Sequence, residues 1–240
     1  ILTSRLTNVY QLWGYEEVDP PKIERLETLM AGGAIASEEI LNVVSDEALG
    51  LRPEMTTSIA RVASTRFSKK ARPLRLFTSG TVFKCKENIE GSKYIEETTQ
   101  SGIELFGVSE IYGEIELLAI LIQSLINLNL KKDIKPVLLV GHTGILNLIT
   151  SKLDHKLKRK IRHLLVSYNL IELNQLNLPV YENEIVKRVI NCRGDYRLVL
   201  DLIDELFGKS EISNELQLLF KYILPLAEDN NIAIQFDPTF

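Results

Sequence analysis

Cysteine, tryptophan and histidine are all scarce in this sequence. Its 240 residues include two cysteines, one tryptophan and three histidines. Cys85 and Cys192 are too few for a disulfide framework, and their spacing is not that of a metal-binding motif. We therefore expect a reducing, cytoplasmic setting. The histidines are widely dispersed, so we expect no metal site, and nothing in the sequence calls for a cofactor.

The chain also lacks an excess of positive charge and any long apolar segment. Lys and Arg total 28 against 32 Asp and Glu, which gives a net charge of −4. This balance argues against a broad electropositive surface for RNA, so we do not expect tRNA as a partner. No apolar run approaches the ~20 residues that a membrane-spanning helix needs, and we expect no membrane interaction. The remaining composition is that of a globular protein.

The first part of the chain alternates between helical and extended patterns. Residues 1–13 carry apolar side chains at helical spacing and end at Gly14. Residues 15–18 alternate like a short strand. Helical spacing over 23–30 predicts a second, short helix.

Short strands dominate the middle of the chain. They are predicted over residues 49–52, 75–77, 82–83 and 100–106, with a turn at Ser79-Gly80. A helix is predicted to begin at Thr56 or Thr57, with either hydroxyl as its N-cap. Consecutive short strands joined by brief turns are typical of an antiparallel sheet.

The rest of the sequence is mainly helical. A very apolar helix is predicted over 114–128, a buried strand over 137–140, helices to 228 and a last strand over 232–236. The predicted fold class is α+β: an antiparallel sheet flanked by helices, with a mostly helical C-terminal portion. We divide the chain into a core (1–130), a strand plus a helical insertion-like region (131–230) and a strand that returns to the core (231–240).

The polar residues of the last predicted core strand suggest a binding site. Gln100 and Glu104 project from one face of that strand, about 13 Å apart along its axis, and Gly102 leaves open space between them. Glu54 supplies a second carboxylate from the turn before a helix, with the Thr56 hydroxyl beside it. Carboxylates suit an ammonium group and can fix the orientation of an imidazole. Alternation alone favours the simpler interpretation that these residues line the solvent face of a half-exposed strand.

Three segments resemble the amino-acid-binding floor and motif 2 of the histidyl-tRNA synthetase family. They are Leu51-Arg52-Pro53-Glu54-Met55-Thr56, Gly80-Thr81-Val82-Phe83-Lys84-Cys85-Lys86-Glu87 and Gln100-Ser101-Gly102-Ile103-Glu104-Leu105-Phe106-Gly107. The resemblance implies a class II aminoacyl-tRNA synthetase-like fold. It also implies histidine binding, with Glu54, Thr56 and Gln100 around the α-amino group and Glu104 at the imidazole.

Lys84 departs from the synthetase pattern. The family has an arginine at this position to grip the ATP phosphate, and a lysine cannot reproduce the bidentate guanidinium fork. The resemblance therefore implies weak or absent adenylation and no catalytic residue. A divergent synthetase fragment that activates histidine with ATP remains the alternative, and a synthetase-like scaffold without a ligand is a third.

Other segments are similar to the family of ATP phosphoribosyltransferase regulatory subunits, which are inactive paralogues of the synthetase. They are Trp13-Gly14-Tyr15, Leu26-Glu27-Thr28-Leu29 with Ala31-Gly32-Gly33, and Ile59-Ala60-Arg61-Val62-Ala63. This resemblance implies feedback control of histidine biosynthesis and a short-form catalytic subunit as partner. It also implies a homodimer through a motif 1-like region, which comprises the predicted helix over 1–13 and the short strand over 15–18. It also implies that the remainder of the family domain is absent after residue 240.

Overall fold

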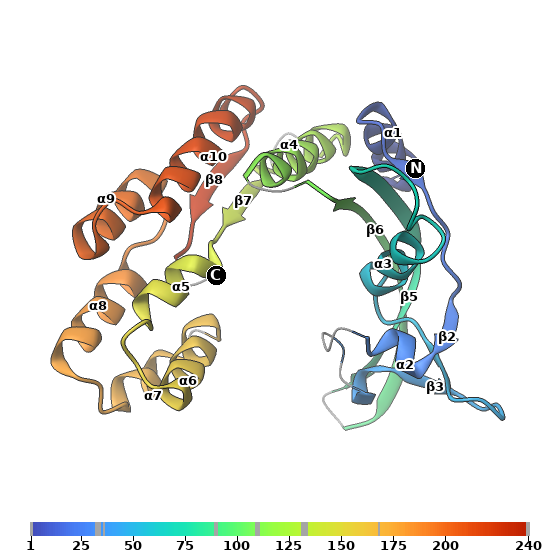
Figure 1. Cartoon of the computed structure of the whole chain (residues 1–240), viewed down its shortest axis with the longest axis horizontal. Helices are drawn as coiled ribbons and strands as arrows, with labels where there is room; N and C mark the ends of the chain where they lie inside the picture. The colour runs from blue at the N-terminus through green and yellow to red at the C-terminus, as the bar shows by residue number, and fades with distance from the viewer. Residues whose placement is uncertain are drawn as a thin grey trace. The chain divides into compact units, whose positions relative to one another are not determined.

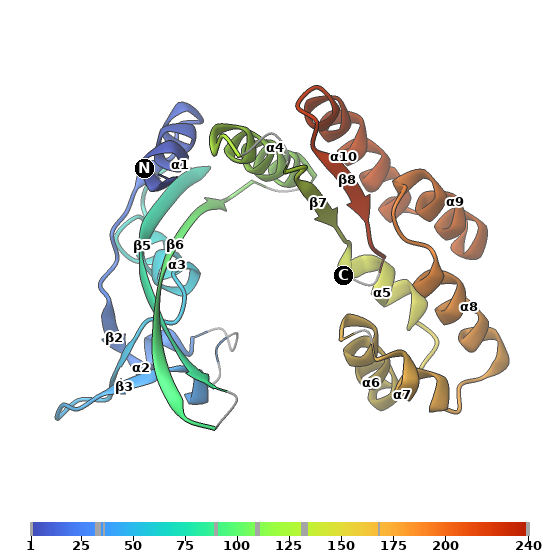
Figure 2. The same cartoon turned by 180° about the vertical axis from the view of Figure 1, so that it is seen from behind.

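The computed structural model describes residues 2–31, 35, 37–88, 91–108, 111–130, 134–167 and 169–238. The chain divides into two compact units, Ile1–Asn129 and Leu130–Phe240. Figures 1 and 2 show the elements of each unit from opposite sides. The α+β class predicted from the sequence is confirmed, since the first unit contains two of the three described sheets and the second unit is mostly helical.

The first unit is built around a long two-stranded ribbon and a short third strand. Its elements are α1 (Leu2–Leu12), β1 (Glu16–Glu17), β2 (Ile23–Arg25), α2 (Leu26–Leu29), a 3₁₀ turn (Ser37–Glu39), β3 (Leu41–Val43), β4 (Leu49–Leu51), α3 (Thr56–Ser64), β5 (Leu74–Glu87), β6 (Lys93–Phe106) and α4 (Ile111–Asn127). The main sheet has the order β1-β5-β6, with β1 parallel to β5 and β6 antiparallel to it.

Helices cover both faces of the main sheet. On one face, Met55, Ile59 and Ala63 of the α3 region pack with Leu74 and Leu76 of β5. On the other face, Val9 and Tyr10 of α1 and Ile120 of α4 pack with Phe77 of β5. The alternation of a strand explains why Leu76 and Phe77, adjacent in sequence, belong to different cores.

The turn expected at Ser79-Gly80 does not form, and this prediction was wrong. β5 continues from Leu74 to Glu87 and pairs with β6 along its whole length. The glycine is required for a different reason, because a Cβ at Gly80 would lie 2.7 Å from Arg52 Nη2 and 2.9 Å from Met55 Cε. These side chains pack directly against the strand backbone.

The helix expected over 23–30 begins later than predicted. Residues Ile23–Arg25 form a strand that pairs with β4, in a second sheet of order β2-β4-β3, and the helix covers only Leu26–Leu29. The apolar spacing of this segment fits a helix, but pairing with a strand 26 residues away in register (Glu24 with Gly50) overrides it.

An ion pair joins β5 to α4, and a hydrogen bond adds the segment between α1 and β1. The Arg75 guanidinium on β5 donates two hydrogen bonds to the Glu116 carboxylate on α4, at 2.8 and 2.7 Å, and the Tyr15 hydroxyl donates a third at 2.9 Å. The bond from Arg75 holds the pKa of Glu116 below its usual value, although burial opposes this effect. The bidentate geometry favours a well-defined orientation of α4 on the sheet.

The second unit contains a small parallel sheet and six helices among its described residues. They are β7 (Val137–Val140), α5 (Thr143–Ile149), α6 (His155–Val166), α7 (Leu170–Gln175), α8 (Val180–Asn191), α9 (Tyr196–Phe207), α10 (Glu211–Glu228) and β8 (Ala233–Phe236). β8 pairs with β7, and its Phe236 packs against Phe220 of α10. The strand expected to return to the core thus has its pairing partner within this unit. No helix among the described residues is long and apolar enough to cross a membrane.

Candidate functional site

The face of the ribbon that carries Gln100 and Glu104 is partly covered and partly open. Register places Gly80 opposite Gln100, Thr78 opposite Gly102 and Leu76 opposite Glu104, so these six residues share one face. The same face packs against α3 through Leu76. A Cβ at Gly102 would meet no heavy atom within 4 Å. Open space therefore separates the Gln100 and Glu104 side chains, as the sequence predicts.

Glu54 lies at the start of α3 and caps it. Its carboxylate accepts hydrogen bonds from the backbone N–H groups of Thr56, at 2.5 Å, and Thr57, at 2.9 Å. The hydroxyl cap expected from Thr56 or Thr57 was wrong, since the N-cap position, Met55, has no side-chain cap and the carboxylate satisfies the helix N–H groups instead. Burial alone would raise the pKa of Glu54, but the hydrogen bonds from Thr57 and Thr56 hold it below its usual value.

Glu104 approaches Thr56 from the sheet. Burial raises the pKa of this carboxyl, the Thr56 hydroxyl lowers it by a hydrogen bond, and the charge of Glu54 raises it further. The structure thus brings Glu54, Thr56 and Glu104 together, although fifty residues separate the two acids. No ion pair within the described part of the chain involves either carboxylate. Two acids at one partly buried position favour a cationic ligand, because each stabilises positive charge and destabilises the other.

Gln100 contributes an amide at the other end of the open space. It lies four residues before Glu104 on the same face of β6. Its Oε1 atom is buried and has no hydrogen-bond partner. The structure therefore places this residue on the shared face with Glu104, and none of the hydrogen bonds found among the described residues joins its Oε1 atom to Glu54, Thr56 or Glu104.

Arg52 is the residue that the sequence analysis missed. Its side chain is fully buried, and it donates hydrogen bonds from Nε to the Thr81 carbonyl at 2.9 Å and from Nη1 to the Pro20 carbonyl at 2.6 Å. Its Nη2 atom is buried without a partner. An arginine is almost never fully buried unless its guanidinium is paired with other groups. Nothing in the sequence around Arg52 indicates that this side chain is buried.

Lys84 lies farther along β5, where the strand is exposed. It pairs in register with Glu96, and strand alternation puts it on the face that carries Gly80. Four residues of strand, about 13 Å, separate it from Gly80. Within the described residues Lys84 has no ion pair, whereas Lys86 pairs with Glu96 at 2.9 Å.

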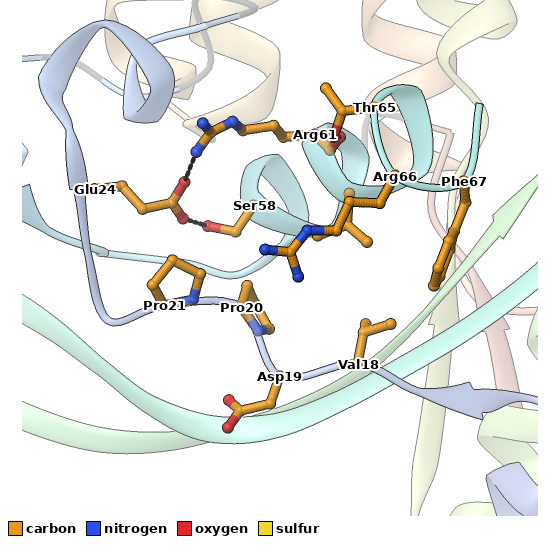
Figure 3. Close-up of a pocket in the computed structure, with 11 residues that line it drawn as sticks. Val18, Asp19, Pro20, Pro21, Glu24, Ser58, Arg61, Thr65, Arg66 and Phe67 are labelled. Atoms are coloured by element: carbon orange, nitrogen blue, oxygen red, sulfur yellow. Dashed lines mark hydrogen bonds and ion pairs between the residues drawn. The ribbon is translucent and has the colours of Figure 1, made fainter.

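A separate cavity of about 420 Å³ lies on another side of α3 (Figure 3). Glu24, Ser58 and Arg61 line it, together with the Val18–Pro21 segment and Phe67. The Glu24 carboxylate accepts hydrogen bonds from the Ser58 hydroxyl and from Arg61 Nη1, the latter at 3.0 Å. None of the four predicted binding residues lines this cavity. Its buried acid is already neutralised by Arg61, so we assign the candidate site to the Glu54–Thr56–Glu104 group rather than to this cavity.

Replacing Glu54 by alanine is expected to lower the free energy of unfolding by about 1 kcal/mol at neutral pH, because two N–H groups of α3 lose their acceptor. Since the pKa of Glu54 is lowered in the fold, this contribution is present above its usual value of 4.5 and is lost as pH falls through the lowered pKa. Urea denaturation at neutral and acidic pH measures both effects. Glu97→Ala, at an exposed glutamate of β6, is the matched control; an equal loss in both variants would contradict the capping role.

Within the described residues, no group of three or more His, Cys, Asp or Glu side chains is placed to hold a metal ion. The groups of the candidate site are two carboxylates, a hydroxyl and an amide. Such a set suits a small ligand that carries positive charge and hydrogen-bonding groups.

Comparison with known proteins identifies close relatives. The sequence model described as histidyl-tRNA synthetase matches residues 1–240. Two proteins named ATP phosphoribosyltransferase regulatory subunit, from Prochlorococcus marinus strains MIT 9313 and SARG, are 50% identical over 239 residues and 45% identical over 240. Each alignment covers 100% of this chain and 61% of the relative, so the chain spans about three-fifths of the length of these proteins.

Solved structures show the same fold. An ATP phosphoribosyltransferase regulatory subunit/histidyl-tRNA synthetase from Bacillus halodurans C superposes with a TM-score of 0.85 at 23% identity, covering 100% of this chain and 63% of that one. A histidyl-tRNA synthetase from Nostoc sp. PCC 7120 gives 0.75 at 17% identity, covering 100% and 57%. An ATP phosphoribosyl transferase complex from Thermotoga maritima gives 0.71 at 14% identity, covering 99% and 80%. The class II synthetase-like fold expected from the sequence is confirmed.

Proposed function

Because the chain belongs to the histidyl-tRNA synthetase family, we propose that it is part of a non-catalytic regulatory subunit of ATP phosphoribosyltransferase that binds histidine for feedback control. Support comes from the names of relatives at 45–50% identity. The observation that carries the proposal is the meeting of two acids from distant parts of the chain at the Thr56 hydroxyl, beside open space over Gly102.

Histidine fits the charges of this site. In the proposed complex, Glu54, Thr56 and Gln100 surround the α-amino group and Glu104 approaches the imidazole. Burial is the main cause of the raised pKa of Glu104, and the charge of Glu54 raises it further; an ammonium group would neutralise that repulsion between the two carboxylates. A carboxylate at one imidazole nitrogen keeps that nitrogen in its N–H form and orients the ring.

Lys84 supports a binding rather than a catalytic role. Transfer of an adenylyl group requires donors that are held in place around the phosphate. Lys84 is exposed and offers a single point charge where the synthetase pattern has a guanidinium. The alternative function, ATP-dependent activation of histidine by a divergent synthetase, depends on this lysine neutralising a phosphate.

The proposed assembly includes a short-form catalytic subunit and a second copy of the chain. The motif 1-like region supports dimerisation, because Leu2 and Leu12 of α1 are 60% and 76% exposed. Apolar side chains at such exposure favour burial against a partner. Feedback requires that histidine bind one state of this assembly more tightly than another, since only differential affinity shifts an equilibrium.

Titration calorimetry of the full chain with histidine tests the proposal. We expect saturable binding, and no binding at millimolar histidine would overturn it. Histidine-dependent exchange of pyrophosphate into ATP is expected to be absent, because the phosphate-gripping guanidinium is missing; exchange above background would favour the synthetase alternative. In the assembled complex, a Glu104→Ala variant that remains fully inhibited by histidine would instead favour a scaffold without a ligand.

A further inference from the structure

The cavity on the other side of α3 has no part in the proposed histidine binding. It measures about 420 Å³, and small-molecule sites commonly enclose about 300–1,000 Å³. Figure 3 shows its two walls, one formed by α3 and the turn after it, the other by the segment that leads from Val18 to Glu24. Both walls belong to the first unit, so the cavity is defined within that unit alone.

The wall from Val18 to Pro21 is fixed to its surroundings. The Val18 N–H group donates to a carbonyl of β5 at 2.8 Å, and Arg52 Nη1 donates to the Pro20 carbonyl at 2.6 Å. The two consecutive prolines also restrict the backbone of this segment. These contacts hold the wall in place before any ligand binds, which lowers the cost of ordering on binding.

An ion pair joins this side of the cavity to α3. The Glu24 side chain is only 2% exposed, and its carboxylate accepts hydrogen bonds from the Ser58 hydroxyl and from Arg61 Nη1, the latter at 3.0 Å. The Arg61 side chain is 52% exposed, and within the described residues only its Nη1 group takes part in this pair. Glu24 therefore offsets the charge of Arg61, while other N–H groups of the guanidinium remain available as donors.

Arg66 gives the cavity a positive charge that no neighbour offsets. It is exposed, and among the described residues it has neither a hydrogen bond nor an ion pair. Figure 3 shows its guanidinium extending over the space toward the two prolines, with the Asp19 carboxylate directed away from it. Burial lowers the pKa of Arg52, and the charge of Asp19 partly opposes this effect, so Asp19 acts on that buried guanidinium. The cavity thus keeps one net positive charge.

Much of the remaining lining is apolar. Aliphatic, proline and aromatic side chains face the cavity from both walls: Val18, Pro20, Pro21, Val62 and Phe67. An inorganic anion would leave these side chains in contact with water, whereas an organic acid with an apolar body would cover them. A carboxylate also matches the planar fork of an arginine, with which it can form two parallel hydrogen bonds.

We propose that this cavity is a second binding site, which takes a small organic monoanion with a carboxylate head and an apolar body. The carboxylate lies at the Arg66 guanidinium, and the body lies between Phe67 and the two prolines. The required charge is the reverse of that at the Glu54–Thr56–Glu104 group, where two acids favour a cation. The inference does not depend on histidine binding, and histidine is a poor ligand here because Glu24, already paired, cannot receive its ammonium group.

Titration calorimetry of the full chain with 2-naphthoate, 2-naphthamide and acetate tests the proposal. The first probe is an aromatic monocarboxylate, the second has the same rings without the charge, and the third has the charge without an apolar body. We expect 2-naphthoate to bind with a Kd of about 1 mM or below, and the other two to bind at least about tenfold more weakly. Equal binding of either comparison probe, or no binding of 2-naphthoate at about 10 mM, overturns the proposal.

Arg66→Met locates the binding, because it removes the guanidinium that has no partner. We expect the Kd for 2-naphthoate to rise at least about tenfold in this variant. Lys69→Met is the matched control, since it removes one exposed positive charge nearby without altering the lining of the cavity, and it should keep the wild-type Kd. An unchanged Kd in Arg66→Met, or an equal rise in both variants, overturns the proposal.

A competition experiment separates this site from the proposed histidine site. Saturating histidine should leave the Kd for 2-naphthoate unchanged, because the two ligands occupy different sides of α3. Mutual exclusion of histidine and 2-naphthoate would place both in one site and would overturn the second site. Binding of 2-naphthoate by a chain that fails to bind histidine would overturn the proposed function and support this inference.

Discussion

Replacing Glu104 by glutamine is expected to raise the Kd for histidine by about 10- to 100-fold. A hydrogen bond to a charged group contributes about 1.5–3 kcal/mol, and the amide of glutamine cannot neutralise a cation. Titration calorimetry at neutral pH measures the change. Glu97→Gln, on the opposite face of the same strand, removes an exposed carboxylate and should leave the Kd unchanged. A Glu104→Gln variant with wild-type affinity would contradict the placement of the imidazole at this residue.

Glu104→Gln is expected to stabilise the fold although it weakens histidine binding. Measuring both therefore separates an effect on binding from an effect on folding. Burial raises the pKa of Glu104 above its usual value of 4.5, so protonation of this carboxyl group stabilises the folded state. The associated stability is present below pH 4.5 and is lost as pH rises through the raised pKa. Above the raised pKa the ionised carboxylate destabilises the free protein, and there Glu104→Gln should unfold at a higher urea concentration while it binds histidine less tightly.

The pKa of Glu104 also gives histidine binding by the wild-type chain a pH dependence. Affinity should fall as pH decreases through the raised pKa, because the protonated carboxyl no longer carries the negative charge that stabilises a cationic ring. The decline should begin at a higher pH than an ordinary glutamate would give. Glu104→Gln should remove this part of the pH profile.

Replacing Arg52 by methionine is expected to lower the free energy of unfolding by about 2–5 kcal/mol. Methionine fills much of the volume, but the carbonyls of Pro20 and Thr81 lose their donor in a buried environment, at about 1–3 kcal/mol each. Burial lowers the pKa of Arg52, which shows that the charge is held at some cost, while Asp19 and Glu24 offset part of it. Urea denaturation followed by circular dichroism measures the loss.

Arg66→Met is the matched control for this experiment. Arg66 is exposed at the cavity on the other side of α3 and has no hydrogen bond or ion pair among the described residues. Its replacement should change the free energy of unfolding by less than about 0.5 kcal/mol. Similar stability of Arg52→Met and Arg66→Met would show that the buried guanidinium contributes nothing to the fold.

Local periodicity predicted the elements that depend on local contacts. α1 has its apolar stripe and its terminating glycine in the sequence, and the structure confirms it over Leu2–Leu12. The alternation of residues 100–106 correctly indicated a strand with Gln100 and Glu104 on one face. The choice of the four candidate residues needed the family resemblance, since alternation alone favours a solvent face for Gln100 and Glu104. Their binding of histidine stays a prediction.

Features that depend on distant partners were not predictable in this way. Ile23–Arg25 became a strand because β4 pairs with it, and the supposed turn at Ser79-Gly80 became continuous strand because β6 pairs along its full length. The partners of Arg52 are about thirty residues away on either side. In a sequence, a glycine commonly indicates a turn. At Gly80 it instead marks the position where the Arg52 guanidinium lies close to the strand backbone.

The length of the β5–β6 ribbon has a consequence for the lysine at its far end. Beyond Phe83, every residue of β5 is exposed, and two-stranded ribbons without a covering layer are only marginally rigid in water. The ammonium group of Lys84 therefore stands on a solvent-exposed part of the ribbon. Electrostatic catalysis needs charges that are preorganised in a dry site, and restoring arginine at this position alone would not recreate that environment.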